Sequence, residues 1–156
     1  MRLVRDDSEN VAAWVASHIP DVRPLGFTSC KAIGVVASNG DPLGGAVFHD
    51  YQPHFKTISV SCAAVSPRWL TRNIVGEILG YAFEEIGMFK VWSAVSIHNT
   101  RSLKLVSGLG FSKEGTLRHQ FGLKNHAVIY GMIAPEFSAK YRKDRYGKQA
   151  QVSDAA

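Results

Sequence analysis

Two polar residues, Asn99 and Ser102, stand three positions apart directly after an apolar run at residues 91–97. Asparagine is a favoured N-cap of a helix, because its side-chain oxygen accepts a backbone N–H that has no partner within the helix. Apolar residues then recur at helical spacing up to Gly110, which suits the left-handed residue that ends many helices. The spacing predicts a strand, a helix capped by Asn99, and another strand after Gly110, where Phe111 returns the chain to the core.

A second candidate for chemistry is the segment 66–73, which lies between a strand-like run and a helix-like run and contains Arg68 and Arg72. The first N–H groups of a helix have no partner inside the helix, and together with two guanidinium groups they attract an anion. The segment is therefore a candidate site for a pyrophosphate group. The alternative is that both arginines are solvated and bind nothing.

These residues must be positioned by a mixed set of helices and strands. A strong hairpin signal at residues 39–41 joins two β-rich runs, and Asp7 or Ser8 is suited to cap an N-terminal helix. The order of the elements is typical of an α/β domain with three layers. The expected strands cover residues 31–37, 43–48, 57–65, 91–97 and 127–133, and the other expected helices cover residues 7–19 and 74–86.

The composition indicates one globular domain. The 156 residues contain 46% hydrophobic and 20% charged residues, a balance typical of folded proteins. The sequence contains no apolar stretch near the roughly 20 residues that a membrane span needs, and its N-terminus turns acidic where a secretory signal needs apolar residues. We therefore expect a cytoplasmic protein without membrane contact. Cys30 and Cys62 lack metal-ligand spacing, so we expect reduced, buried cysteines and no metal site.

The net charge of +5 is unevenly distributed, because the segment 140–148 is strongly basic. Basic chain ends often bind polyanions through the release of counterions. Contact with nucleic acid through this tail is therefore an open alternative, although the sequence has no zinc-finger spacing and no aromatic RNA-binding signature. A solvated chain end without a specific partner is the simpler interpretation.

The segment 99–118 resembles the acetyl-CoA-dependent N-acetyltransferases of the GNAT superfamily, and most of all the RimJ/RimL-type branch and small acetyltransferase-like proteins of phages and prophages. The resemblance covers residues 5–137 and implies an α/β fold, the three-layer mixed-sheet GNAT fold. We therefore expect a GNAT acetyltransferase domain at residues 1–137 and a basic, unassigned tail at residues 138–156. The pattern is Asn-x-x-Ser-(x)7-Gly-Phe-x-x-Glu-Gly-x-x-Arg, formed by Asn99, Ser102, Gly110, Phe111, Glu114, Gly115 and Arg118.

The resemblance implies that acetyl-CoA is the cosubstrate and that its pantetheine arm lies where the strands ending near residues 65 and 97 splay apart. The phosphate loop of the family, Gln/Arg-x-x-Gly-x-Gly/Ala, falls on Arg68, Thr71 and Asn73, so both small positions are substituted. The loop is then either a functional variant in which Arg72 compensates or a decayed site, and we expect the former. The acetyl-CoA-binding residues implied by the resemblance are Val65, Arg68, Thr71, Arg72, Asn73, Ile74, Val75, Asn99 and Ser102, with Arg101 and Lys104 as further phosphate contacts.

The usual proton-transferring residues of the family are missing by position. Many relatives carry a Glu base on the strand at 57–65 and a Tyr acid in the helix after the Asn, where this chain has Ser59 and Val106. Thioester aminolysis can run largely on proximity, which supplies about 7–11 kcal/mol of the barrier. The expected catalytic residues are therefore Ser61, Ser102 and Tyr130.

Two alternatives for catalysis stay open beside these candidates. A water chain would take the proton of the amine to Asp50, His49 or His54. An acyl-enzyme would form at Cys62, which is the weaker alternative because nothing adjacent indicates a lowered thiol pKa.

The sequence thus predicts an N-acetyltransferase that moves an acetyl group directly from acetyl-CoA to a primary amine, either a small amine or a protein N-terminus. The expected substrate loops lack the acidic cluster that a polyamine pocket requires, which favours a weakly charged or aromatic amine or a peptide N-terminus. The first alternative is a catalytically degenerate GNAT-fold module that binds CoA or another protein. The second is a phage protein directed to nucleic acid. A homodimer is a further expectation that rests on the apolar strand at 127–133.

Overall fold

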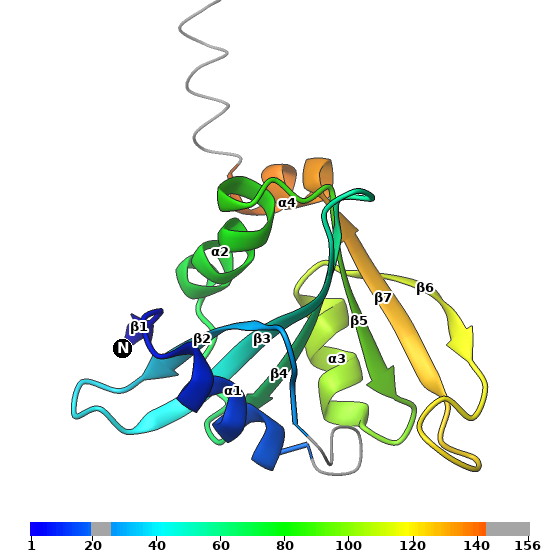
Figure 1. Ribbon diagram of the computed structural model, residues 1–156, viewed down its shortest axis with the longest axis horizontal. Coiled ribbons are helices and arrows are strands. Elements are labelled where there is room, and N and C mark those ends of the chain that lie inside the picture. The colour runs from blue at the N-terminus through cyan, green and yellow to red at the C-terminus, as the bar shows by residue number, and fades with distance from the viewer. Residues whose placement is uncertain (20–25, 143–156) are drawn as a thin grey trace, which may run out of the picture.

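A computed structural model describes residues 1–19 and 26–142. The described residues form one seven-stranded sheet with helices on both faces (Figure 1). The strands are β1 (Arg2–Val4), β2 (Lys31–Val36), β3 (Pro42–Gln52), β4 (Thr57–Ala64), β5 (Lys90–Ser96), β6 (Ser112–Leu117) and β7 (Ala127–Ile133). The helices are α1 (Ser8–Ser17), α2 (Arg72–Gly80), α3 (Thr100–Gly108) and α4 (Ala134–Tyr141), and η1 (Tyr81–Glu85) is a short π-helix.

The sheet consists of two antiparallel halves. Its strand order is β1-β2-β3-β4-β5-β7-β6, and within each half all neighbours are antiparallel. The halves meet at β4 and β5, which form the one parallel pair among the described strands. This arrangement confirms the expected mixed-sheet α/β fold.

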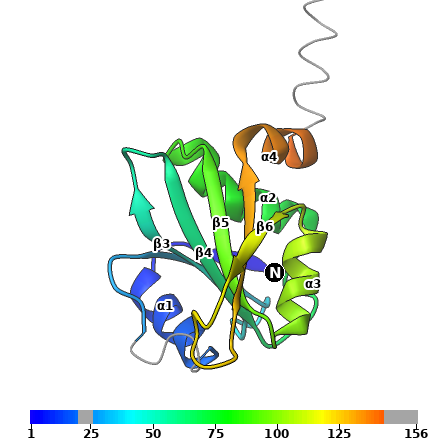
Figure 2. The same cartoon turned by 90° about the vertical axis from the view of Figure 1, so that its right-hand side faces the viewer.

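The helices lie on opposite faces of the sheet and complete three layers (Figure 2). The helix α1 packs on one face, where Val15 is fully buried against Ala32 and Val47. The other face carries α2, α3 and α4, and its larger core includes buried residues of all three helices. The two cores lie on either side of β3 and β4, because successive side chains of a strand point to opposite faces.

Most expected elements are present, and their local signals explain them. The cap at Asn99 and the left-handed Gly110, with φ of 101°, enclose α3 as predicted. The strand β7 has the predicted bounds. The buried Phe111 returns the chain to the core.

Asp7 occupies the N-cap position of the first helix as predicted, but the expected side-chain hydrogen bond is missing. Neither Asp7 nor Ser8 caps α1 with its side chain. The Asp7 carboxylate accepts a hydrogen bond from the Asn10 side chain, and the Ser8 hydroxyl oxygen accepts the Ala32 N–H of β2 at 2.7 Å. The side chain of Ser8 therefore ties the start of α1 to the sheet instead of capping the helix.

Two elements were not predicted, the short β1 and the helix α4. The division expected at residue 137 falls inside α4, whose Phe137 is only 1% exposed. The Glu136 carboxylate accepts the N–H of Ile133 and so fixes the turn into this helix. The remainder of the predicted tail, residues 143–156, lies outside the described residues.

The second predicted helix, 74–86, is correct in place but differs in its ends and in its form. It begins at Arg72, and its last turn is the π-helix η1, in which the Ile86 N–H bonds to the Tyr81 carbonyl at 3.1 Å. Within the described ranges, no helix is long and apolar enough to cross a membrane.

Candidate functional site

The strands β4 and β5 separate shortly after they begin. They pair at three positions only, 57 with 90, 58 with 91 and 59 with 92. Beyond these positions β4 continues to follow β3 up to Ala64, while β5 follows β7 up to Ser96. Each strand therefore turns one backbone edge toward the gap, and such edges carry N–H and C=O groups that a ligand can pair with.

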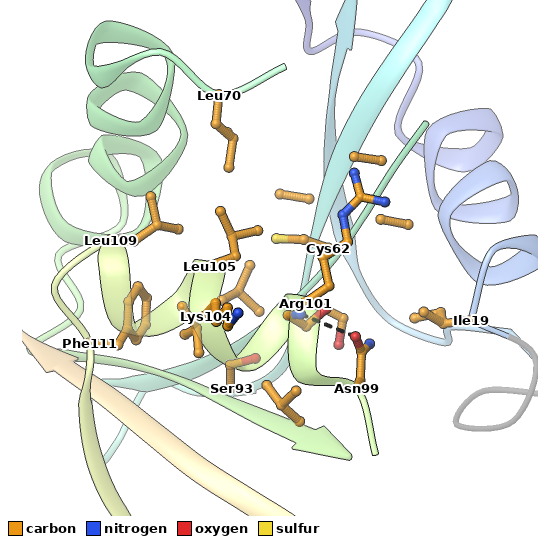
Figure 3. Close-up of a pocket in the computed structure, with 18 of the residues that line it drawn as sticks. Ile19, Cys62, Leu70, Ser93, Asn99, Arg101, Lys104, Leu105, Leu109 and Phe111 are labelled. Atoms are coloured by element: carbon orange, nitrogen blue, oxygen red, sulfur yellow. Dashed lines mark hydrogen bonds between the residues drawn. The ribbon is translucent and has the colours of Figure 1, made fainter. Parts of the chain in front are cut away.

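A cavity of about 650 Å³ lies in this gap, between the splayed strands and the helices α2 and α3 (Figure 3). It reaches both faces of the sheet, because His18 and Ile19, which follow α1, line it on one side while α2 and α3 form the wall on the other. The strands contribute small and polar residues to it. These are Ser61, Cys62, Ala63 and Ala64 of β4 and Ser93, Ala94 and Ser96 of β5.

The N-terminal end of α3 forms the polar part of the cavity wall. The Asn99 Oδ1 accepts the Ser102 N–H at 3.1 Å, and both residues line the cavity. Arg101 and Lys104, which are exposed at the same helix, line it as well. Two cations beside a helix N-terminus make this wall attractive for an anionic ligand.

The loop before α2 has an ordinary backbone despite its substituted small residues. Thr71 is the N-cap of α2 with φ −89° and ψ 163°, and its hydroxyl accepts the Ile74 N–H at 3.2 Å. This extended conformation suits a β-branched residue, so the position does not require glycine for its dihedral angles. Asn73 lies within the helix.

Several residues of the predicted cofactor set lie away from the cavity. Of those between 65 and 75, only Val75 is among the lining residues. The Val65 N–H donates to the Leu43 carbonyl at 3.0 Å, and its side chain is exposed. Arg72 Nη2 donates to the Lys140 carbonyl of α4, so its placement does not support the predicted compensation for the substituted loop.

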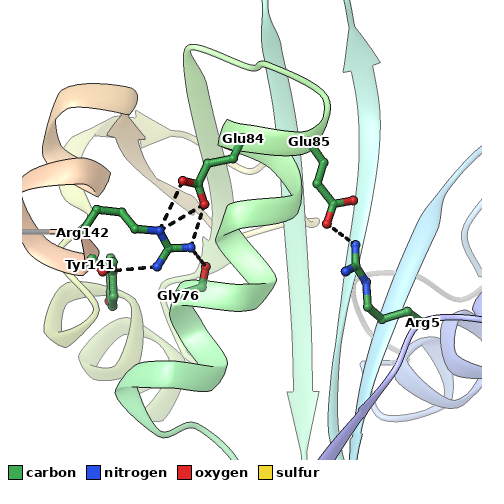
Figure 4. A network of polar contacts seen from close by, with 6 residues as sticks. All are labelled: Arg5, Gly76, Glu84, Glu85, Tyr141 and Arg142. Atoms are coloured by element: carbon green, nitrogen blue, oxygen red, sulfur yellow. Dashed lines mark hydrogen bonds and ion pairs between the residues drawn. The ribbon is translucent and has the colours of Figure 1, made fainter. Parts of the chain in front are cut away.

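The helix α4 connects the two helices that form the cavity wall. Arg142, which follows α4 directly, donates to the Gly76 carbonyl of α2 at 3.0 Å and to the Glu84 carboxylate of η1 at 2.7 Å (Figure 4). On the other side, Tyr141 Oη donates to the Leu109 carbonyl at the end of α3 at 2.7 Å. Contacts of α4 therefore fix α2 relative to α3.

The predicted catalytic residues are only partly brought together. Ser61 and Ser102 both line the cavity, from β4 and α3. Tyr130 lies on β7 opposite Ser93, one strand away from the cavity. Val106, at the position of the usual Tyr, is a buried apolar part of the wall.

Cys62 also lines the cavity, but its thiol is not activated. Burial raises the pKa of the Cys62 thiol to about 12, because the thiolate would lose its hydration. The thiolate is the nucleophilic form, so an acyl-enzyme at Cys62 is disfavoured.

Three residues that the sequence suggested only separately are joined in one hydrogen-bonded chain. His49 Nδ1 lies 2.7 Å from Asp50 Oδ2, and His49 Nε2 lies 2.8 Å from Ser61 Oγ. His49 is 4% exposed, and its ring lies 5.2 Å from that of Phe27. His54 instead is exposed beside Phe55, in the turn that joins β3 to β4.

Comparison with known proteins agrees with this architecture. No protein-family model matches the chain. A curated relative, the uncharacterized N-acetyltransferase YoaA of Bacillus subtilis (strain 168), is 22% identical over 99 residues, which are 60% of this chain and 56% of that protein. The chain thus spans little more than half the length of this relative.

Solved structures of acetyltransferases share the fold at low sequence identity. The spermidine/spermine N-acetyltransferase SpeG of Vibrio cholerae superposes with a TM-score of 0.62 at 15% identity, over 70% of this chain and 68% of that chain. A ribosomal-protein alanine acetyltransferase of Vibrio fischeri superposes with a TM-score of 0.59 at 18% identity, over 67% of this chain and 62% of that chain. With its splayed strands and helix α3, this chain has the fold of the GNAT N-acetyltransferases.

Proposed function

We propose that this protein transfers an acetyl group from acetyl-CoA directly to a primary amine. The observation that carries the proposal is the cavity between β4 and β5, which passes through the sheet and is bordered by open strand edges. A cavity that reaches both faces lets a thioester enter from one side and an amine from the other. Bringing the two reactants together in this way supplies a large part of the rate of such a transfer.

The residues around the cavity fit acetyl-CoA in their chemistry. An extended pantetheine arm carries amide groups, and the open edges of β4 and β5 together with Asn99 offer partners for them. Its phosphates would lie near Arg101 and Lys104 and near the first N–H groups of α2, beside Arg68 and Asn73. The proposed acetyl-CoA contacts are therefore Val75, Asn99, Ser102, Arg101 and Lys104, with Arg68 and Asn73 at the phosphates.

The charges of the cavity favour an acceptor that is not a polycation. Among the described residues that line it, Arg101 and Lys104 carry full charges, and both are positive. A polyamine would need carboxylates there, because like charges repel it. The two structural relatives above act on different acceptors by their names, so the shared fold leaves the acceptor open. We therefore propose a peptide N-terminus or a weakly charged small amine.

Binding of acetyl-CoA is the first test. A ligand at about 100 times its dissociation constant stabilises the native state by about 2.7 kcal/mol, which a melting curve resolves. We expect a raised melting temperature with acetyl-CoA and with CoA, but not with an unrelated nucleotide at the same concentration. No shift at millimolar acetyl-CoA would contradict the proposal.

A charge-reversal variant tests the proposed wall. The double substitution Arg101→Glu, Lys104→Glu should weaken acetyl-CoA binding at least about tenfold at low salt, and less at high salt, because the effect is electrostatic. The control is the double substitution Lys113→Glu, Lys124→Glu at two exposed residues that do not line the cavity, which changes the net charge by the same amount. An equal loss in the control would show a general effect of net charge instead of a local one.

A catalytically inactive GNAT-fold module is the second candidate, and a specific observation favours it. The wall position of the usual Tyr is the apolar Val106. This candidate predicts that acetyl-CoA binds without acetylation of any amine, including an alanine-led peptide, spermidine and phenethylamine. Turnover with any of these amines would exclude it.

The cytoplasmic location, the homodimer, the phage relationship and the nucleic-acid contact stay predictions. The basis given for the homodimer was wrong, because β7 pairs with both β5 and β6 and is not an edge strand of the sheet. Lys140 and Arg142 of the basic segment are engaged within the fold, since Lys140 Nζ donates to the Gly108 carbonyl and Arg142 pairs with Glu84. Nucleic-acid binding would therefore depend on the remaining basic residues of the segment.

A further inference from the structure

We infer that Asp50, His49 and Ser61 form a proton relay that takes the proton from the acceptor amine. The inference rests on the proposed function and assigns the proton acceptor that the usual family positions lack. Ser61 is the catalytic residue, because it lines the cavity. His49 and Asp50 lie behind it as positioning residues that act through its hydroxyl group.

The contact between His49 and Asp50 depends on an irregularity in β3. Neighbouring residues of a regular strand point to opposite faces, so their side chains cannot meet. Here the register of β3 and β4 shifts between His49 and Gln52, and Asp50 has a φ of 52°. A left-handed residue of this kind is uncommon outside glycine, and such bulges often turn side chains toward active sites. The bulge brings the carboxylate to 2.7 Å from the imidazole.

The carboxylate decides which nitrogen of His49 carries the proton. An ionised carboxylate can only accept hydrogen bonds, so Nδ1 must donate to Asp50. In the neutral ring, Nε2 is then unprotonated and accepts the Ser61 hydroxyl at 2.8 Å. The ring is therefore oriented to receive a proton through Ser61, and the imidazolium that forms is stabilised by the carboxylate.

The relay lies on the face of the sheet where an amine would enter. Along β4, Val60, Cys62 and Ala64 pack toward the core under α2, while Ala63 packs toward α1. Ser61 shares the face of Ala63, because side chains alternate along a strand. The cavity lets the serine hydroxyl reach the gap from the α1 side, opposite the side of α3, where we place acetyl-CoA.

The step that we assign balances in atoms and charge. The amine nitrogen forms a bond to the thioester carbonyl carbon and loses a proton to Ser61 Oγ, while the serine proton passes to His49 Nε2. The C–S bond then breaks and the thiolate of CoA takes a proton from water. His49 returns its extra proton to water, so the products are the amide and CoA. A serine ester is not needed, because oxygen esters react with amines more slowly than thioesters do.

The test compares Ser61→Ala, His49→Gln and Asp50→Asn with the wild-type protein. Asparagine tolerates the left-handed backbone at residue 50, so Asp50→Asn changes the charge and retains the bulge. The matched control is His54→Gln, an exposed histidine in the turn next to the relay. The measured rate is the rate at which CoA is released from acetyl-CoA, with the CoA separated by chromatography. The acceptor is an alanine-led peptide, phenethylamine or water, and a base at this site should accelerate the reaction with each of the three acceptors.

We expect the three variants to keep the dissociation constant for acetyl-CoA and to lose about 10²-fold or more in kcat, the usual contribution of a general base. Ser61→Thr, which keeps a hydroxyl group, should restore most of the rate.

Other outcomes overturn the relay. If the wild-type protein acetylates an amine and Ser61→Ala is equally fast, the relay is wrong and the proposed function stands. If the wild-type protein binds no acetyl-CoA, both the relay and the proposed function are wrong. Release of CoA no faster than in buffer, or an acetylated Ser61 found by mass spectrometry, would also contradict the relay.

Discussion

The substitution Phe137→Ala should destabilise the whole domain, although residue 137 lies at the boundary of the predicted tail. Phe137 is 1% exposed, stacks on Phe83 with 4.8 Å between ring centroids, and has the Arg142 guanidinium 5.0 Å above its ring. Removing a buried phenylalanine costs about 3–5 kcal/mol, because packing is lost and a cavity remains. The total free energy of unfolding is about 5–15 kcal/mol for a domain, so this loss is a large fraction of it.

Urea denaturation followed by tryptophan fluorescence measures this loss, since the buried Trp69 reports on the core. The midpoint should fall with an unchanged slope, and the melting temperature should drop by roughly 6–20 °C at about 2–4 °C per kcal/mol. Leu123→Ala is the control, because Leu123 is 85% exposed and its removal should change stability by less than about 0.5 kcal/mol. A loss below about 1 kcal/mol for Phe137→Ala would refute the packing of α4 against the core.

Three further predictions concern a helix cap, a glycine contact and a buried thiol. Asn99→Ala should lower the free energy of unfolding by about 1 kcal/mol in urea denaturation, whereas Asn99→Asp, an equally good cap, should retain it. Gly44→Ala would place a methyl group 2.4 Å from the Trp69 ring and should lower the free energy of unfolding by about 1–3 kcal/mol. Gly108→Ala should not destabilise the protein, because no atom lies within 4 Å of the added methyl group. Equal losses of unfolding free energy in the two variants would contradict this prediction. Because burial raises the Cys62 pKa to about 12, iodoacetamide at pH 8 should label it, by mass spectrometry, far more slowly than in urea; equal labelling rates would argue against burial.

The contacts of α4 connect the stability of the domain to the proposed site. Its contacts reach Gly76 of α2 and Leu109 of α3, and both helices form the cavity wall. Loosening α4 should therefore disturb the cavity from a distance, by letting these two helices move relative to one another. A truncation placed at the expected boundary of residue 137 would remove these contacts.

Local signals in the sequence were sufficient for the segment that carries the strongest resemblance. The β5–α3–β6 segment has the predicted order, because each of its boundaries is set by a single residue. Asn99 caps α3 with its own side chain, and Gly110 adopts the left-handed conformation after the helix. Such signals act between residues a few positions apart and can be seen without the rest of the fold.

Signals that depend on distant residues were missed or misassigned. The helix α4 is held by Phe83, by Glu84 and by carbonyl groups of α2 and α3. The sequence of α4, taken without these contacts, is typical of the start of a basic tail. Ser8 resembled a helix cap, but its oxygen is taken by the Ala32 N–H, 24 positions away. A side chain with two available partners gives no local indication of which one it will bind.

The same distinction between local and distant contacts applies to the candidate site. The sequence by itself determined the fold family and the cap that Asn99 forms at the start of α3. Only the tertiary structure decided that Arg72 turns to α4 and that His49 meets both Asp50 and Ser61. The physical reason is that these contacts depend on a shift of strand register and on a helix that packs from far along the chain. Both are properties of the assembled sheet and not of any short stretch of sequence.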